Sequence, residues 1–120
     1  MPQANTEEFD SQMYAETRDL LGDGFSALLD KYFSSAQRHI ATIDQALKDN
    51  DAKIIADLTH NIKSTSAGFG FMEVSTIAKS MEHLCRDTNT APIAKVNALH
   101  EQLKAALAAI ENRYRSGALD

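Results

Sequence analysis

Apolar residues recur along most of the chain at intervals of three and four positions, which is the spacing of one face of an α-helix. The pattern predicts a short helix over about residues 10–21 and a long one that ends near residue 49. A third helix is predicted over about residues 51–69, a fourth around residues 74–84, and a last one that starts at Pro92. No alternating strand pattern and no internal repeat accompanies them.

Each predicted helix has one apolar face, which we expect to point inward. The side chains on these faces are Met13, Leu20 and Leu21 in the first helix; Phe25, Leu28, Leu29, Tyr32, Ala36, Ile40, Ile43 and Leu47 in the second; Ile55, Leu58, Ile62, Thr65 and Phe69 in the third; Val74, Ile77, Met81 and Leu84 in the fourth; and Val96, Leu99, Leu103, Leu107, Ile110 and Tyr114 in the last. Long amphipathic helices with short connections predict an all-α, antiparallel four-helix bundle over about residues 23–115. The short additional N-terminal helix is expected to cap one end.

The connections carry residues that end and begin helices. Gly22 and Gly24 are expected to end the first helix, and residues 88–90 to form a turn. Asp23 and Asp51 are candidate N-caps of the helices that follow them, because a carboxylate can accept hydrogen bonds from the free N–H groups of a first turn.

Composition narrows the function classes. The 120 residues carry a net charge of -5, with 43% hydrophobic and 24% charged residues, as in a single globular domain over residues 1–120. The sequence has no basic stripe and no tryptophan, so nothing in it favours nucleic-acid binding. No apolar run approaches the length of a membrane span. The single Cys85 and an acidic N-terminus without an apolar segment favour a cytoplasmic protein. The charged outer faces favour a monomer.

One polar side chain stands out on the third helix. His60 lies about 170° from the centre of that helix's apolar stripe, so it is predicted to point into solvent. Ala56, Ser64 and Ala67 are its neighbours on the helix wheel, and all three are small, which predicts an accessible surface around the imidazole. Lys63 lies three residues further on, within reach of the ring.

These residue types suit phosphoryl acceptance. An exposed imidazole is largely neutral at pH 7–8 and can then act as a nucleophile, and a neighbouring cation favours that neutral form. The same cation, Lys63, can afterwards face the negative charge of a phosphoryl group. Phosphoryl transfer requires mainly positioning and charge stabilisation, so a partner protein can supply the metal ion.

Residues 58–82, LTHNIKSTSAGFGFMEVSTIAKSME, resemble the signature of histidine-containing phosphotransfer (Hpt) domains. That signature has a histidine, a lysine three residues later, small residues, a glycine ten residues after the histidine, and leucine-like positions ending in glutamate. The matching positions are His60, Lys63, Ser64, Thr65, Ser66, Ala67 and Gly70, followed by Val74, Ile77, Ala78, Met81 and Glu82. Residues 21–46 also resemble the family's second helix, so the resemblance spans about residues 18–110. One departure is Ser64, where the family most often has glycine; its hydroxyl could bond the imidazole or the phosphate.

The resemblance implies a phosphorelay intermediate of a two-component system. His60 would accept a phosphoryl group from the phospho-aspartate of a receiver domain, such as that of a hybrid sensor kinase, and pass it to the receiver domain of a response regulator. Lys63 would be the phosphate-facing cation, and Ala56, Ser64, Ala67 and Gly70 would give clearance for docking. The protein would have no ATP site, so it would not be an enzyme, and no cofactor of its own, with Mg²⁺ held by the partner receiver.

Three other classes of helical protein can carry a histidine in a bundle. A histidine-kinase dimerisation domain typically has proline shortly after its histidine and needs an ATP-binding domain, and this chain has neither. A di-metal bundle needs Glu-x-x-His pairs, but the residues three before each histidine are Ala36, Asp57, Ser80 and Asn97, so no metal site is predicted. A helical adaptor that binds a receiver or a partner helix without carrying phosphate stays open. His39, His83 and His100 fit structural roles.

Overall fold

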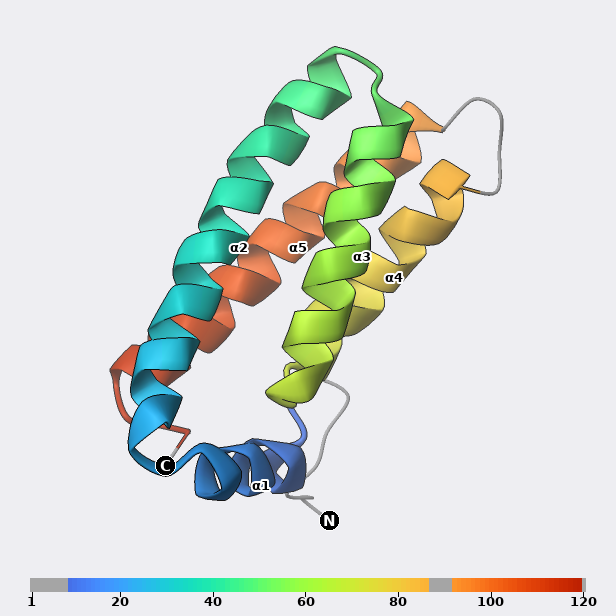
Figure 1. Cartoon of the computed structure of the whole chain (residues 1–120). Coiled ribbons are helices and arrows are strands. Elements are labelled where there is room, and N and C mark those ends of the chain that lie inside the picture. Colours follow the sequence, from blue (N-terminus) through green and yellow to red (C-terminus); the bar gives the residue numbers. More distant parts are fainter. Residues whose placement is uncertain (1–8, 87–91, 120) are drawn as a thin grey trace.

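The computed structural model describes residues 9–86 and 92–119. Its elements are α1 (Ser11–Leu21), the 3-10 turn η1 (Gly22–Gly24), α2 (Phe25–Lys48), α3 (Ala52–Gly68), α4 (Met72–Arg86) and α5 (Ile93–Arg115). The predicted all-α bundle with a short additional helix is confirmed (Figure 1). The turn predicted at residues 88–90 lies outside the described residues.

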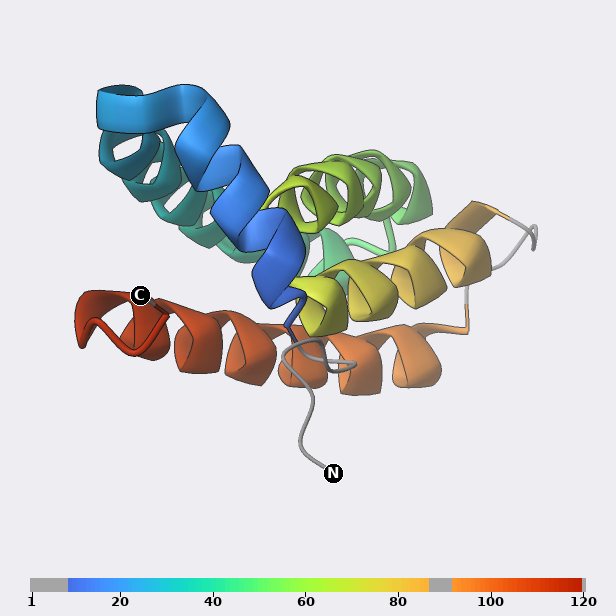
Figure 2. The ribbon, with the colours of Figure 1, turned by 90° about the horizontal axis from the view of Figure 1, so that it is seen from below.

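The four long helices lie side by side and alternate in direction (Figure 1). In this view α3 and α4 form the front right of the bundle. The helix α1 does not run along the bundle but crosses its lower end, as the view from below shows (Figure 2). Close contacts join α2 to α3, α3 to α4, and α4 to α5. Over the described residues, none of the helices is both long and apolar enough to cross a membrane.

Of the two N-caps predicted from the sequence, Asp51 is confirmed and Asp23 is wrong, and Asp10 caps α1 without having been predicted. The carboxylates of Asp10 and Asp51 accept hydrogen bonds from the backbone N–H groups of Met13 and Ile54. Asp23 instead lies within η1, and α2 has no side-chain cap. The turn η1 leads directly into α2, so the carbonyl of Gly22 accepts the N–H of Phe25 in place of a carboxylate.

The core is densest where α1 meets the bundle. Aromatic rings from four segments pack there with centroid separations of 5.0 to 6.3 Å: Phe9, Tyr14, Phe25, Tyr32, Phe33, Phe69 and Phe71. All are buried, and Phe71 is fully so. These rings fix the α3–α4 connection against α1 and α2, and thereby set where α4 begins.

The apolar contacts predicted for α1 were wrong. Met13, Leu20 and Leu21 are all exposed, Leu20 at 85%, while Tyr14 is the buried side chain of this helix. Because α1 crosses the end of the bundle, only one of its sides touches other helices. Leu28 of α2 is likewise 44% exposed, although the spacing places it on the inward stripe.

The buried face of α3 is rotated from the predicted one. Thr65 is exposed and Leu58 is only partly buried, whereas Ala56, Thr59 and Ser66 are buried almost completely. Ala56 lies between His60 and Lys63 on the helix wheel, on the side of α4, whereas Ser66 contacts Tyr32 of α2. Small side chains let neighbouring helices approach closely. Apolar periodicity missed this face because hydroxyl-bearing residues count as polar.

The two buried hydroxyls on this face are satisfied locally. Thr59 Oγ1 donates to the carbonyl of Ile55 at 2.7 Å, and Ser66 Oγ shares a hydrogen bond with the Tyr32 hydroxyl at 2.6 Å. A paired hydroxyl avoids most of the cost of burial. Small polar residues can therefore stand among the apolar ones on the buried face of α3 without a large loss of stability.

Gly70 is required by the turn between α3 and α4. Its φ of +79° is in the left-handed region, and a Cβ at this position would collide with the backbone carbonyl of Asp10. The Gly70 carbonyl in turn accepts a hydrogen bond from the Asp10 N–H at 2.7 Å. This close backbone contact holds the start of α1 against the end of the bundle.

A Gly70→Ala substitution should therefore destabilise the protein by about 2–4 kcal/mol, because backbone strain adds to a steric collision. Gly68→Ala is the matched control. Gly68 is helical with free space around its Cα, so alanine there should be neutral or stabilising by up to about 1 kcal/mol. Urea unfolding of both variants measures the difference, and equal midpoints would contradict this account of Gly70.

Candidate phosphoacceptor site

His60 lies on the outside of α3, at the seam where α4 packs against it. Its side chain is 56% exposed, so the predicted exposure is confirmed. The helix continues for two turns on either side, which holds the Cα in place. A partner protein can therefore reach the imidazole without any rearrangement of the bundle.

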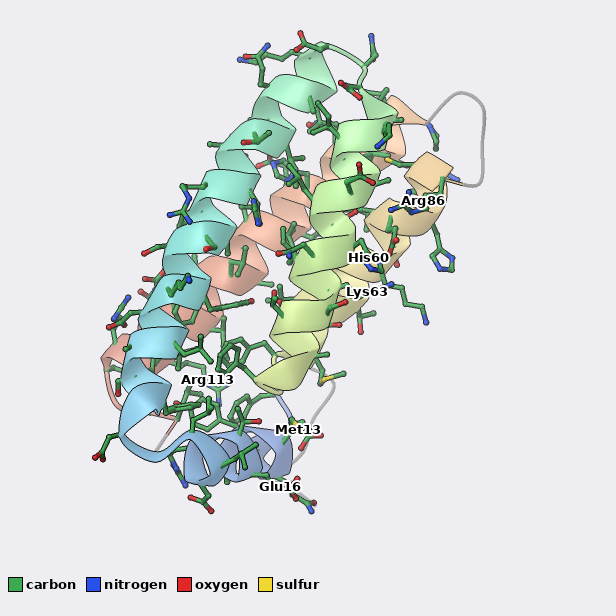
Figure 3. The ribbon with its side chains drawn as sticks, viewed as in Figure 1. Met13, Glu16, His60, Lys63, Arg86 and Arg113 are labelled. Atoms are coloured by element: carbon green, nitrogen blue, oxygen red, sulfur yellow. The ribbon has the colours of Figure 1, made fainter. Side chains whose placement is uncertain are left out.

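A buried carboxylate from α4 organises the side chains around this ring. Glu82 has a side chain only 8% exposed, and its Oε2 lies 2.9 Å from His60 Nδ1. Its Oε1 accepts a hydrogen bond from Lys63 Nζ at 2.8 Å, and Oε2 also accepts one from Arg86 Nε at 3.0 Å. Figure 3 shows His60, Lys63 and Arg86 close together along the seam of α3 and α4.

These bonds keep Glu82 ionised. Burial by itself would raise the pKa of this carboxyl, but hydrogen bonds from Lys63, Arg86 and His60 outweigh it and lower the pKa of Glu82 to about 2. An ionised carboxylate can only accept hydrogen bonds, so His60 Nδ1 must be the donor. In the neutral ring the lone pair available for attack is then on Nε2.

A second carboxylate extends the cluster along α3. Asp57 accepts hydrogen bonds from Lys53 at 2.7 Å and from Arg86 Nη2 at 3.2 Å, and the bond from Lys53 is the main reason that its pKa is lowered. Arg86 thus bridges Glu82 and Asp57, and both carboxylates raise the pKa of the guanidinium. Cations flank His60 along the helix, with Lys63 on one side and Arg86 on the other.

The small residues near His60 divide into two groups. Ser64 is exposed and Ala67 is partly buried, so both reach the surface, Ser64 one helical turn and Ala67 two turns after His60. The hydrogen bond that the hydroxyl of Ser64 was expected to offer the imidazole is not formed at Nδ1, where Glu82 occupies that position. Glu82 thus occupies the Nδ1 side of the ring and not the Nε2 side.

The other two docking residues were placed wrongly. Ala56 is 1% exposed because it faces α4, so it allows the two helices to approach rather than giving clearance to a partner. Gly70 is buried in the α3–α4 turn, ten residues or about 15 Å along the helix direction from His60. Its requirement is conformational, and it lies too far away to flank the imidazole.

Sequence reasoning missed the parts played by Glu82 and Arg86. Glu82 was matched as the last position of a motif without a role, and Arg86 was not singled out. The signal was present: Glu82 lies among the inward positions of α4, beside Met81 and Cys85, and a buried carboxylate needs cationic partners. Arg86, four residues further on, was the nearest candidate on the same helix.

One of the other histidines, His100, is buried and pairs with a carboxylate of a neighbouring helix. His100 of α5 is completely buried, and its Nε2 lies 2.8 Å from the Asp44 carboxylate of α2. Among the residues with described positions, no three His, Cys, Asp or Glu side chains gather as a metal ion would require.

A helical bundle that exposes a histidine backed by a buried carboxylate and two cations has the architecture of a histidine phosphocarrier. The family model of the Hpt domain matches residues 27–113, and the chain therefore belongs to the Hpt domain family, whose members carry phosphoryl groups in phosphorelays. The fold is similar to that of histidine-containing phosphotransfer protein B from Pseudomonas aeruginosa PAO1. That comparison has a TM-score of 0.85 at 20% identity and covers 92% of this chain and 93% of the other. A comparison with curated proteins gave no match.

The lowered pKa of Glu82 predicts a loss of stability in acid. A carboxyl whose pKa is lower in the folded state stabilises the protein above its unfolded pKa, here 4.5, and the contribution is lost as the pH falls toward 2. Glu82→Gln should remove this part of the pH dependence. We expect a contribution of about 1–2 kcal/mol, less than the full shift would give, because the exposed partners His60 and Arg86 are screened by solvent.

Unfolding free energies measured between pH 2.5 and 6 test this. The wild-type curve should fall more steeply with acid than that of Glu82→Gln. Parallel curves would mean that the three hydrogen bonds do not stabilise the ionised form.

Proposed function

We propose that this protein is a phosphorelay intermediate that accepts a phosphoryl group on Nε2 of His60. The donor is the phospho-aspartate of a receiver domain on a hybrid sensor kinase, and the acceptor is the receiver domain of a response regulator. The observation that carries the proposal is an exposed imidazole whose Nδ1 is tied to the ionised, buried carboxylate of Glu82.

The transfer step needs no proton movement at the ring. The Nε2 lone pair of His60 forms a bond to phosphorus while the bond from phosphorus to the aspartyl oxygen breaks, and that electron pair stays on the released carboxylate. Nδ1 keeps its proton throughout, so the ring gains positive charge. Glu82 is placed to balance that charge because it accepts the Nδ1–H hydrogen bond.

Lys63 supplies the cation for the phosphoryl group. Before transfer, its ammonium is 2.8 Å from Glu82 and its side chain is 29% exposed, so it is held in place but can still reach solvent. A phosphoryl group one turn away attracts it more strongly than a carboxylate already shared with Arg86. Lys63 therefore exchanges its bond to Glu82 for one to the phosphoryl group as that group arrives.

An apolar groove beside the site suits the docking of a receiver. It encloses about 440 Å³ between α2 and α3 near α1, and its lining includes Leu28, Ile62 and Phe69 as well as Asn61, the neighbour of His60. The exposure of Leu28 is explained if a partner covers it. Because Asn61 lines the groove and is adjacent to His60 in the sequence, a docked domain can contact both the groove and the ring.

Incubation with phosphorylated receiver domains should transfer the label to the wild-type protein, and the label should be acid-labile and base-stable. His60→Gln should abolish labelling while changing the free energy of unfolding by no more than about 0.5 kcal/mol, since the ring is exposed. Undiminished labelling of His60→Gln would place the phosphoryl group elsewhere. No labelling of the wild type by any receiver of the source organism would favour a non-phosphorylated adaptor.

Replacing Lys63 with methionine should slow phosphoryl transfer roughly tenfold or more, because a charged group that meets the phosphoryl oxygens is lost. Lys79→Met is the matched control, since Lys79 is an exposed lysine of α4. Stopped reactions analysed for labelled protein measure both rates. Equal slowing in the two variants would show a general effect of charge on docking rather than a role at the phosphate.

A further inference from the structure

We propose that Glu82 keeps the ring of phosphorylated His60 protonated at Nδ1 into weakly alkaline solution, and so keeps the phosphoryl group in the form that leaves readily. This inference rests on the proposed function and adds a property to it. Glu82 would act as a positioning residue that tunes how long the phosphoryl group is carried.

The geometry allows the same hydrogen bond before and after transfer. Nδ1 and Nε2 lie on opposite sides of the imidazole ring, and the Glu82 carboxylate is bonded to Nδ1. A phosphoryl group on Nε2 extends away from α4 and does not displace the carboxylate. Because Glu82 is buried on a helix, it cannot easily turn away from the ring.

The protonation of Nδ1 decides how well the ring leaves. When the bond between phosphorus and Nε2 breaks, the electron pair returns to Nε2 and the phosphoryl group passes to an aspartate or water oxygen. If Nδ1 carries a proton, the ring leaves as a neutral imidazole; if it does not, the ring must leave as an anion. A carboxylate that holds the Nδ1 proton therefore favours onward transfer.

The other charged groups in the cluster strengthen this effect after phosphorylation. Lys63 and Arg86 both bond to Glu82 in the unphosphorylated protein and partly neutralise it. When Lys63 turns toward the phosphoryl group, the Glu82 carboxylate is less compensated and holds the Nδ1 proton more strongly. Asp57 retains part of Arg86, so this guanidinium is drawn less completely to the phosphate.

The remaining charges near the seam lie further from the ring. Lys53 is paired with Asp57 at 2.7 Å, one helical turn or more before His60. On α4, Lys79 and His83 are exposed positions on either side of Glu82 in the sequence. All of these charges come from α3 and α4, the two helices that form the seam.

The experiment uses the full chain phosphorylated with phosphoramidate, a small chemical donor that needs no receiver domain. Loss of the label into water is followed from pH 5 to pH 10 for the wild type and Glu82→Gln. Glutamine has the same shape and can still accept the Nδ1–H bond, but it has no charge. Glu73→Gln is the matched control, since Glu73 is an exposed glutamate of the same helix.

We expect the midpoint of the pH–rate profile to be lower by about one unit in Glu82→Gln, because an opposite charge within hydrogen-bond distance shifts a titration by one unit or more. Near pH 8–9 the label on this variant should then last roughly tenfold longer than on the wild type. Glu73→Gln should follow the wild-type profile. Coincident profiles for the wild type and Glu82→Gln would overturn the inference.

A second measurement does not depend on the folding of a variant. The ¹⁵N NMR shifts of His60 in the phosphorylated wild type report whether Nδ1 carries a proton, and we expect it to be protonated at pH 8. An unprotonated Nδ1 at pH 8 would overturn the inference even if Glu82→Gln failed to fold. Since the label comes from phosphoramidate, these outcomes are separate from a failure of receiver domains to phosphorylate the protein.

Discussion

The buried carboxylate of Glu82 joins the packing of the bundle to the chemistry of its surface. It lies at the seam of α3 and α4 and accepts hydrogen bonds from His60, Lys63 and Arg86. A lone buried charge would destabilise the fold, so the cations Lys63 and Arg86 that bond to Glu82 also stabilise the bundle. Because the carboxylate stays ionised, it selects the ring tautomer and positions two cations on either side of the ring.

The closeness of α3 and α4 makes this arrangement possible. Ala56 of α3 and Ala78 of α4 are buried small residues that let the helices approach. The Ser75 hydroxyl of α4 donates to the Lys63 carbonyl of α3 at 2.9 Å, which fixes the two helices near the site. A wider seam would move Glu82 away from the imidazole. The buried small residues thus determine how close Glu82 lies to the imidazole.

The end of the bundle that α1 crosses and the middle of α3 differ in structure. The aromatic cluster and the Gly70 turn anchor α1 across one end, where a Cβ would disrupt a backbone contact. The middle of α3 carries the exposed histidine, beside an apolar groove that a partner can cover. The imidazole is therefore held both by the helix that carries it and by the hydrogen bond from its Nδ1 to Glu82.

The sequence alone determined the helices, the bundle and the exposure of His60, because these follow from periodicity within single helices. The spacing of His60 and Lys63 also determined that the lysine lies near the ring, since residues three apart share a helix face. The buried side of α3, the burial of Ala56 and the pairing of His60 with Glu82 were decided only by tertiary structure. They depend on how closely α4 approaches and at which register, and a single helix pattern contains neither quantity. A buried carboxylate is therefore visible in the sequence as an anomaly, but its partners become known only when two helices are placed together.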